Sequence, residues 1–113
     1  MSNVVAIDVE MVGTGPNGMS YDTARQQVIN LINSRILVGH DLQRDLGVFH
    51  LTHNNTRDTA TYPPLVQRYG RGQIQKPKLR ELAEAELNCT MSYNHDPVED
   101  ARMAMAVYMK YQW

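Results

Sequence analysis

Two carboxylates, Asp8 and Glu10, lie two positions apart at the end of an apolar, mostly β-branched run that begins at Val4. A run of this kind, closed by Gly13 and Gly15, predicts a buried strand that ends in a turn. Side chains two positions apart on a strand point to the same face, so the two acids are expected to repel each other. A divalent cation between them would offset that repulsion. The alternative is a strand end in water with two solvated acids.

A third carboxylate, Asp45, follows a second apolar run. Residues 36–38 predict a central parallel strand, after which Asp41 can cap a helix. Leu42 and Leu46 lie one turn apart on that helix and predict its buried stripe. Asp45 stands directly beside Leu46, so we expect its side chain to border the core.

The last helix is predicted over residues 97–111, with Asp96 at the N-cap and Pro97 at the first helical position. His95 and Asp100 then occupy the two positions, N′ and N4, whose side chains meet in a hydrophobic staple. A polar pair at these packing positions indicates a functional site. The alternative is a surface histidine beside a helix acid.

Five polar side chains thus stand where core packing would otherwise be expected: Asp8, Glu10, Asp45, His95 and Asp100. In an α/β sheet such positions converge near the carboxyl ends of the strands. Two divalent cations would neutralise the four carboxylates, and a neutral imidazole beside them could deprotonate a water. This set of groups is suited to two-metal phosphodiester hydrolysis.

Hydrophobic periodicity predicts how the elements follow one another. A helix over residues 21–33 separates the first two strands, and residues 57–59 end a weak third strand. Further helices begin near residues 61–64 and cover residues 79–87. This order predicts a small α/β domain with a mainly parallel sheet.

Three segments resemble the three exonuclease motifs of the DEDDh (DnaQ-like) superfamily: residues 8–16, 37–45 and 95–101. Within that superfamily, residues 10–15 and 57–59 resemble the RNA exonuclease 4 and interferon-stimulated exonuclease branch. The resemblance implies a ribonuclease H-like fold and the removal of mononucleotides from a 3′ end.

The resemblance also implies roles for single residues. Two Mg²⁺ or Mn²⁺ ions would be held by Asp8, Glu10, Asp45 and Asp100, with His95 as the general base. The motif spacing selects Asp45 over Asp41 as the third acid. Met11 and Val12 are candidate contacts to the terminal nucleotide.

One departure from the family is large. In the family, two strands and a helix or long loop lie between the glycine turn and the next helix, whereas here only residues 17–20 intervene. On the order of 40 residues are absent, judged from ordinary strand, helix and connection lengths. We therefore expect a reduced ribonuclease H-like fold of about three strands flanked by helices, as a single truncated domain over residues 1–113.

The shortened sheet would place the first strand at an edge. An apolar edge invites pairing with another chain, and a smaller core makes a monomer marginal. We therefore predict a homodimer, or a protein partner, that covers residues 4–7.

Basic side chains cluster in residues 68–80, which contain no acid. Arg68, Arg71 and Lys76 are candidate substrate contacts in this segment, as a strip that follows nucleic-acid phosphates. The alternative is an ordinary solvated loop. The predicted partner is single-stranded RNA because the closest branch acts on RNA, and DNA remains open.

The composition fits a soluble globular protein of 113 residues, with 42% hydrophobic residues, 20% charged residues and a formal net charge of −1. The lone Cys89 excludes an internal disulfide and is compatible with a reducing compartment. The sequence shows no secretory signal pattern and no bilayer-spanning run, so we expect an intracellular protein, nuclear or cytoplasmic, with no membrane partner.

Two functions of different classes are compatible with these patterns. The first is a metal-dependent 3′-to-5′ exonuclease, which the complete set of five catalytic-type residues favours. The second is a catalytically weak or inactive exonuclease-fold module for RNA binding or protein scaffolding, which the missing strands favour.

Overall fold

The computed structural model of the chain describes residues 3–9, 20–70, 76–92 and 96–113. The predictions made for five residues lie outside this part of the chain: Glu10, Met11, Val12, Arg71 and His95. None of the helices in the described part is long and apolar enough to cross a bilayer.

Three short parallel strands form one sheet in the order β1-β2-β3, namely β1 (Val4–Ala6), β2 (Ile36–Gly39) and β3 (Thr56–Asp58). In the register of the sheet, Leu37 of β2 lies between Val5 of β1 and Thr56 of β3. The predicted small parallel sheet, with its first strand at an edge, is confirmed.

The described part of the chain also contains five helices: α1 (Tyr21–Ile32), α2 (Leu42–Val48), α3 (Pro63–Tyr69), α4 (Leu79–Leu87) and α5 (Pro97–Tyr111). The side chain of Ser20 caps α1 by accepting a hydrogen bond from the Thr23 N–H at 3.1 Å. Asp96 caps α5 in the same way through the Val98 N–H at 2.9 Å. These side-chain oxygens satisfy donors that the first turn of a helix leaves without partners.

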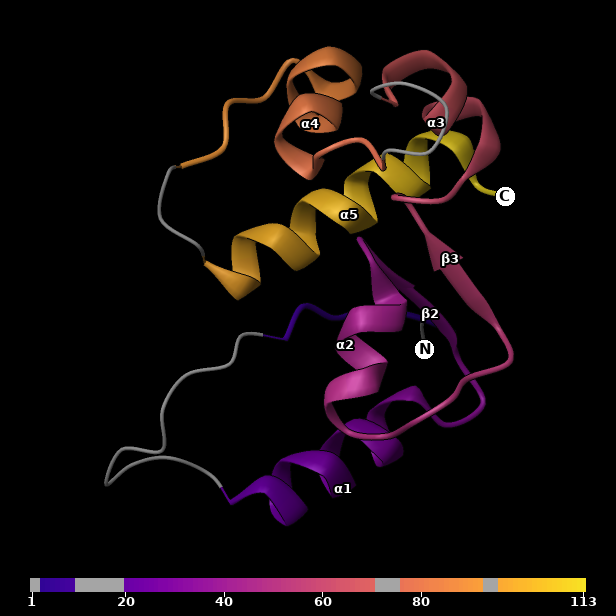
Figure 1. Cartoon of the computed structure of the whole chain (residues 1–113), viewed down its shortest axis with the longest axis vertical. Helices are drawn as coiled ribbons and strands as arrows, with labels where there is room; N and C mark the ends of the chain where they lie inside the picture. Colours follow the sequence, from indigo (N-terminus) through magenta and orange to yellow (C-terminus); the bar gives the residue numbers. More distant parts are fainter. Residues whose placement is uncertain (1–2, 10–19, 71–75, 93–95) are drawn as a thin grey trace.

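The sheet lies between α5 on one face and α1 with α2 on the other, while α3 and α4 pack on the far side of α5 (Figure 1). Alternate side chains of β2 explain this layering, because neighbours in a strand point to opposite faces. Leu37 packs with Ile32 of α1 and Leu42 of α2, whereas Val38 packs with Ala104 and Tyr108 of α5. A third cluster joins α3, α4 and α5: Leu65, Leu82 and Val107.

Candidate active site

Asp8 and Asp45 approach each other at the carboxyl end of the sheet. One residue beyond β1, the Ile7 N–H donates a hydrogen bond to Val38 O at 3.1 Å, so the chain is still paired with β2 there. Asp8 follows directly, next to the carboxyl end of the sheet. Asp45 lies in the first turn of α2 with only 4% of its surface exposed, which confirms that it borders the core. The Val9 N–H donates a hydrogen bond to the Asp45 carboxylate and thereby ties α2 to the chain after β1.

The surroundings of Asp45 disfavour its charged form. Burial raises the pKa of this carboxyl, the charge of Asp8 raises it further, and the Val9 hydrogen bond lowers it; the resulting pKa is about 7. Oδ2 of Asp8 and Oδ2 of Asp45 are both buried, and Asp45 Oδ2 has no hydrogen-bond partner within the described ranges. The ionised form of Asp45, buried beside the negative charge of Asp8, creates a need for positive charge between the two.

Asp100 lies in the first turn of α5, which faces Asp8 across a hollow of about 540 Å³. The hollow is lined by Ala6, Ile7, Asp8, Val9, Val28, Pro97, Val98, Ala101, Arg102 and Met105. The charge of Asp100 also acts on His40, the residue that follows β2. Asp8, Asp45 and Asp100 are therefore carried by three elements that meet at the carboxyl end of the sheet.

The described acids fit a divalent cation, although they do not complete a site. Considering only the residues that the structure describes, no three His, Cys, Asp or Glu side chains form a metal-binding group. Glu10 and His95, which the sequence assigns to the same site, lie outside that part. The donors present are hard carboxylate oxygens, and one of them is buried without a hydrogen bond, as expected where a cation binds.

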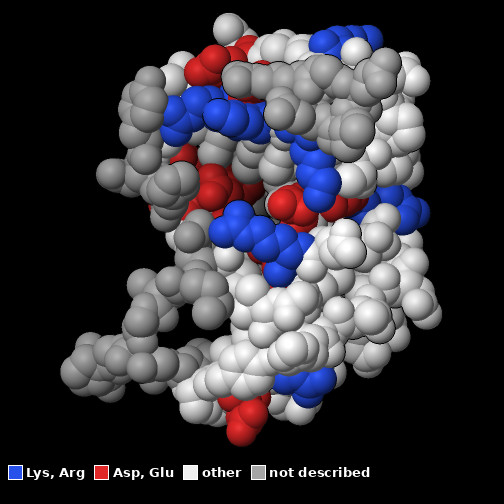
Figure 2. Space-filling model, in the orientation of Figure 1, with Lys and Arg blue, Asp and Glu red and all other residues white. Residues whose placement is uncertain are grey.

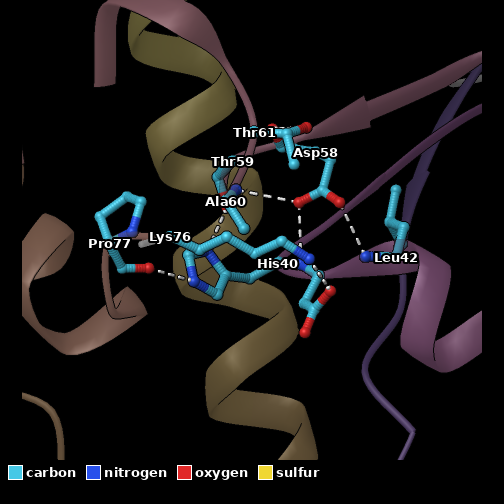
Figure 3. A network of polar contacts seen from close by, with 9 residues as sticks. His40, Leu42, Asp58, Thr59, Ala60, Thr61, Lys76 and Pro77 are labelled. Atoms are coloured by element: carbon cyan, nitrogen blue, oxygen red, sulfur yellow. Dashed lines mark hydrogen bonds and ion pairs between the residues drawn. The ribbon is translucent and has the colours of Figure 1, made fainter. Parts of the chain in front are cut away.

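The first turn of α2 is capped from outside the helix, which corrects one prediction. Asp41 stands at the N-cap position, but its side chain makes no cap hydrogen bond, and its backbone is left-handed with φ of 69°. A side-chain cap requires an extended backbone at that position, so the prediction that Asp41 caps the helix is wrong. Asp58, at the end of β3, instead accepts from the N–H groups of Asp41 and Leu42 at 2.8 and 2.9 Å (Figure 3).

The sequence predicts no role for Asp58. It indicates only that this residue ends a weak strand, within the segment that resembles the family branch. Its position at the carboxyl end of a strand is a usable signal, because this is where the side chains of an α/β site gather.

His40 joins the end of β2 to the segment that enters α4. Its Nε2 donates to Pro77 O at 2.8 Å, because a carbonyl oxygen can only accept, and its Nδ1 lies 2.7 Å from the Thr59 hydroxyl (Figure 3). Burial lowers the pKa of His40, although the Pro77 hydrogen bond and the charges of Asp58, Asp41 and Asp100 oppose that effect. The ring is therefore a neutral structural link beside the site.

Acidic side chains gather in the middle of the face drawn in Figure 2, and Lys and Arg side chains surround them. Lys76 places a positive charge at the start of α2 (Figure 3). Its Nζ lies 2.9 Å from Oδ1 of Asp41, and 46% of its side chain remains exposed. A positively charged rim around an acidic centre favours the approach of a polyanion.

Arg68 lies elsewhere. It stands in the last turn of α3, with Nη1 3.4 Å from Oε2 of Glu86 and 3.3 Å from the Tyr111 hydroxyl. Tyr111 and Asp100 are eleven residues apart on α5, which corresponds to about 16 Å along a helix. The structure therefore brings Lys76 close to the acids and places Arg68 toward the other end of α5.

The chain is similar in sequence to several proteins named RNA exonuclease 4. It is 38% identical over 95 residues to the one from Candida glabrata and 42% identical over 94 residues to the one from Neurospora crassa, covering 81% and 80% of this chain. The one from Cryptococcus neoformans is 32% identical over 161 residues, covering 96% of this chain. No protein-family model matches the chain.

The chain spans only part of these relatives, 35% of the Candida protein, 22% of the Neurospora protein and 39% of the Cryptococcus protein. The Cryptococcus alignment is longer than the chain itself, so this relative carries residues that have no counterpart here. That finding agrees with the large deletion that the sequence indicated.

The fold is similar to solved Pan2 structures. The pseudoubiquitin hydrolase-RNA exonuclease module of Saccharomyces cerevisiae Pan2 superposes with a TM-score of 0.67 at 28% identity, over 83% of this chain and 15% of that one. The same module in complex with AAGGAA RNA gives a TM-score of 0.65. The Neurospora crassa Pan2 catalytic unit, at 24% identity and a TM-score of 0.67, supports the fold alone. The chain is therefore similar in sequence to proteins named RNA exonuclease 4, and it has a reduced ribonuclease H-like fold of the kind found in the Pan2 exonuclease modules.

Proposed function

We propose that this chain is a metal-dependent 3′-to-5′ exonuclease that releases mononucleotides from single-stranded RNA. The observation that carries the proposal is the buried carboxylate of Asp45, which lies beside the half-buried Asp8 at the carboxyl end of the sheet. An ionised carboxylate buried beside a second acid is costly unless a cation joins the two. Its place in a fold similar to RNA exonuclease domains supports hydrolysis as the use of that cation.

In this proposal Asp8, Glu10, Asp45 and Asp100 hold two Mg²⁺ or Mn²⁺ ions, and His95 takes the proton of the attacking water. Such ions, when bound, stabilise charge on the phosphoryl group and on the leaving oxygen. The role of the chain is to hold the acids in place and to exclude water around Asp45. His95 acts in its neutral form, so the rate rises from about pH 6 to 8.

Substrate contacts are proposed at three positions along the RNA. Met11 and Val12 contact the terminal nucleotide, and Lys76 with Arg71 contacts the phosphates that precede it. Arg68 would meet the RNA further along, because it lies toward the far end of α5. Binding through these cations weakens as salt concentration rises.

The test is a time course on 5′-labelled single-stranded RNA with Mn²⁺, comparing the natural chain with Asp45→Asn. We expect a ladder that shortens from the 3′ end and is slowed by at least about a hundredfold in Asp45→Asn, since one carboxylate of the metal site is lost. Asp22→Asn, which neutralises an exposed acid on α1, is the matched control and should cleave normally. Equal rates for the two variants would refute the assignment of Asp45.

The alternative of a binding module without turnover is not favoured by the comparisons, since the relatives carry the names of exonucleases. It would gain support if the natural chain bound Mn²⁺ and RNA but left the RNA intact.

We further propose that residues 1–113 form a single reduced domain. We also propose that a second chain, either another copy or a different protein, binds this domain at β1. Two observations support it: β1 lies at an edge of the sheet, and the hollow beside residues 6–9 is lined mainly by apolar side chains. A strand added there would widen the sheet and cover the hollow.

A further inference from the structure

The N-terminus of α2 depends on a residue that is distant in sequence. A helix leaves its first N–H groups without partners inside the helix, and a side chain at the N-cap usually accepts from one of them. In α2 the N-cap residue Asp41 makes no such bond, and its carboxylate pairs with Lys76 instead, at 2.9 Å. The N–H groups at the start of α2 therefore need an acceptor from elsewhere.

Asp58 supplies that acceptor with both of its carboxylate oxygens. Oδ1 accepts from the N–H groups of Asp41 at 2.8 Å and Ala60 at 2.9 Å, and Oδ2 accepts from the Leu42 N–H at 2.9 Å (Figure 3). One side chain thus joins the end of β3, the turn after it and the start of α2. Bonds from several N–H groups to an ionised carboxylate are among the stronger hydrogen bonds in proteins.

We propose that Asp58 is a positioning residue that holds Asp45 against the chain after β1. Asp45 lies only three residues beyond Leu42, in the same first turn of α2, so a displacement of that turn displaces its carboxylate. The contact at stake is the hydrogen bond from the Val9 N–H to Asp45. Asp58 bonds to the N–H groups of Asp41 and Leu42, so it acts on Asp45 through the main chain of α2.

The proposal rests on the proposed function only where Asp45 is treated as a site residue, so its first test needs neither metal nor RNA. The Val9 amide signal in a nitrogen-15 NMR spectrum reports the hydrogen bond to Asp45 directly. The variants are Asp58→Ala, which removes all three bonds, and Asp58→Asn, whose amide nitrogen can no longer accept from one of the N–H groups. The matched control is Ser20→Ala, which removes the side-chain cap of α1 instead.

In Asp58→Ala we expect the Val9 amide to shift upfield and to exchange faster with solvent, with a smaller effect in Asp58→Asn. The Ser20→Ala signal should stay in place although that variant also loses a cap. All spectra are recorded well below the lowest melting temperature of the set, so that every variant is folded. A Val9 signal that is the same in Asp58→Ala and Ser20→Ala would overturn the proposal.

A second measurement uses Mn²⁺ alone, by titration calorimetry. Loss of a residue that orients a ligand costs about 10–100-fold in metal affinity, which is the loss expected for Asp58→Ala against no change for Ser20→Ala. If the natural chain binds Mn²⁺ but does not cleave RNA, the proposed function fails while the Val9 signal and the Mn²⁺ affinity still decide the role of Asp58. If Mn²⁺ does not bind, the Val9 signal alone decides it.

Discussion

At the scale of single residues, Asp45 is the side chain whose surroundings are most unusual. It is buried and lies beside a second acid, and its pKa is raised to about 7. Between pH 4 and 7 the folded chain keeps this proton while the unfolded chain has released it, so the free energy of unfolding falls as pH rises. A shift of about three pKa units corresponds to a loss on the order of 4 kcal/mol, complete above pH 7.

We therefore expect the metal-free protein to be more stable at pH 5 than at pH 8, and Asp45→Asn to remove most of that difference. Urea unfolding at both pH values measures it, with Asp22→Asn as the control for the loss of a charge alone. Added Mn²⁺ should restore stability to the natural chain at pH 8 but not to Asp45→Asn. A pH dependence that is unchanged in Asp45→Asn would contradict the account of this carboxyl.

At the scale of elements, β2 and α2 come together at Gly39. A Cβ atom there would lie 2.3 Å from Cδ2 of Leu42 and 3.1 Å from the main-chain oxygen of Ile7. Gly39→Ala should therefore destabilise the fold by about 1–3 kcal/mol, the usual cost of overpacking. Gly47→Ala is the control, since a Cβ there meets nothing within 4 Å and alanine favours a helix by about 0.5–1 kcal/mol. Chemical unfolding that ranks the two variants in the reverse order would contradict this packing.

The junction of α3, α4 and α5 is held by Glu86, whose side chain is 3% exposed. Burial alone would raise the pKa of this carboxyl, but the hydroxyls of Tyr111 and Tyr69 and the ammonium of Lys110 donate to it and lower the pKa to about 2. Because the folded pKa is depressed, the stabilisation is present above about pH 4.5 and is lost as pH falls through about 2.

Glu86→Gln should accordingly lower the free energy of unfolding at pH 7 by about 3 kcal/mol, the equivalent of that pKa shift. The deficit should shrink steadily as the pH is lowered from 4.5 toward 2, since the natural carboxyl then also becomes neutral. Thermal or urea unfolding of both proteins across this range measures the difference. A deficit that is constant with pH would mean that packing, and not charge, sets the role of Glu86.

The elements could be predicted from the sequence because their signals are local. The Asp96-Pro97 start of α5 and the apolar run of β2 depend on neighbouring residues alone. The cap of α2 could not be predicted, since Asp58 reaches it from another strand and Asp41 adopts a left-handed backbone that only the folded chain imposes. The position of Arg68 could not be predicted for the same reason, because its contact with Glu86 joins two helices that are separate in sequence.

At the scale of the whole molecule, the described residues form a three-stranded sheet with β1 at an edge. The proteins of similar sequence are longer than this chain, which spans 35% and 39% of two of them. If a second chain covers the edge at β1, sedimentation should show a dimer or larger species at micromolar concentration. Val98, which lines the hollow and is 57% exposed, offers a variant: Val98→Asp should weaken association, since it places a charge in an apolar contact. Val98 precedes the proposed site residue Asp100 by two positions, so a change there could also alter activity. Val98→Asp is therefore compared with the natural chain in its association alone. A stable monomer with a cooperative melt would contradict the predicted partner.

We propose that this reduced fold removes nucleotides only from a free 3′ end. Linear and circular forms of one single-stranded RNA, both labelled internally, are mixed with the natural chain and Mn²⁺ to test this. We predict that the linear RNA is shortened to mononucleotides while the circle stays intact, and that Asp45→Asn or removal of the metal stops the reaction. Cleavage of the circle, or survival of the linear RNA in a folded sample that binds Mn²⁺, would contradict the account.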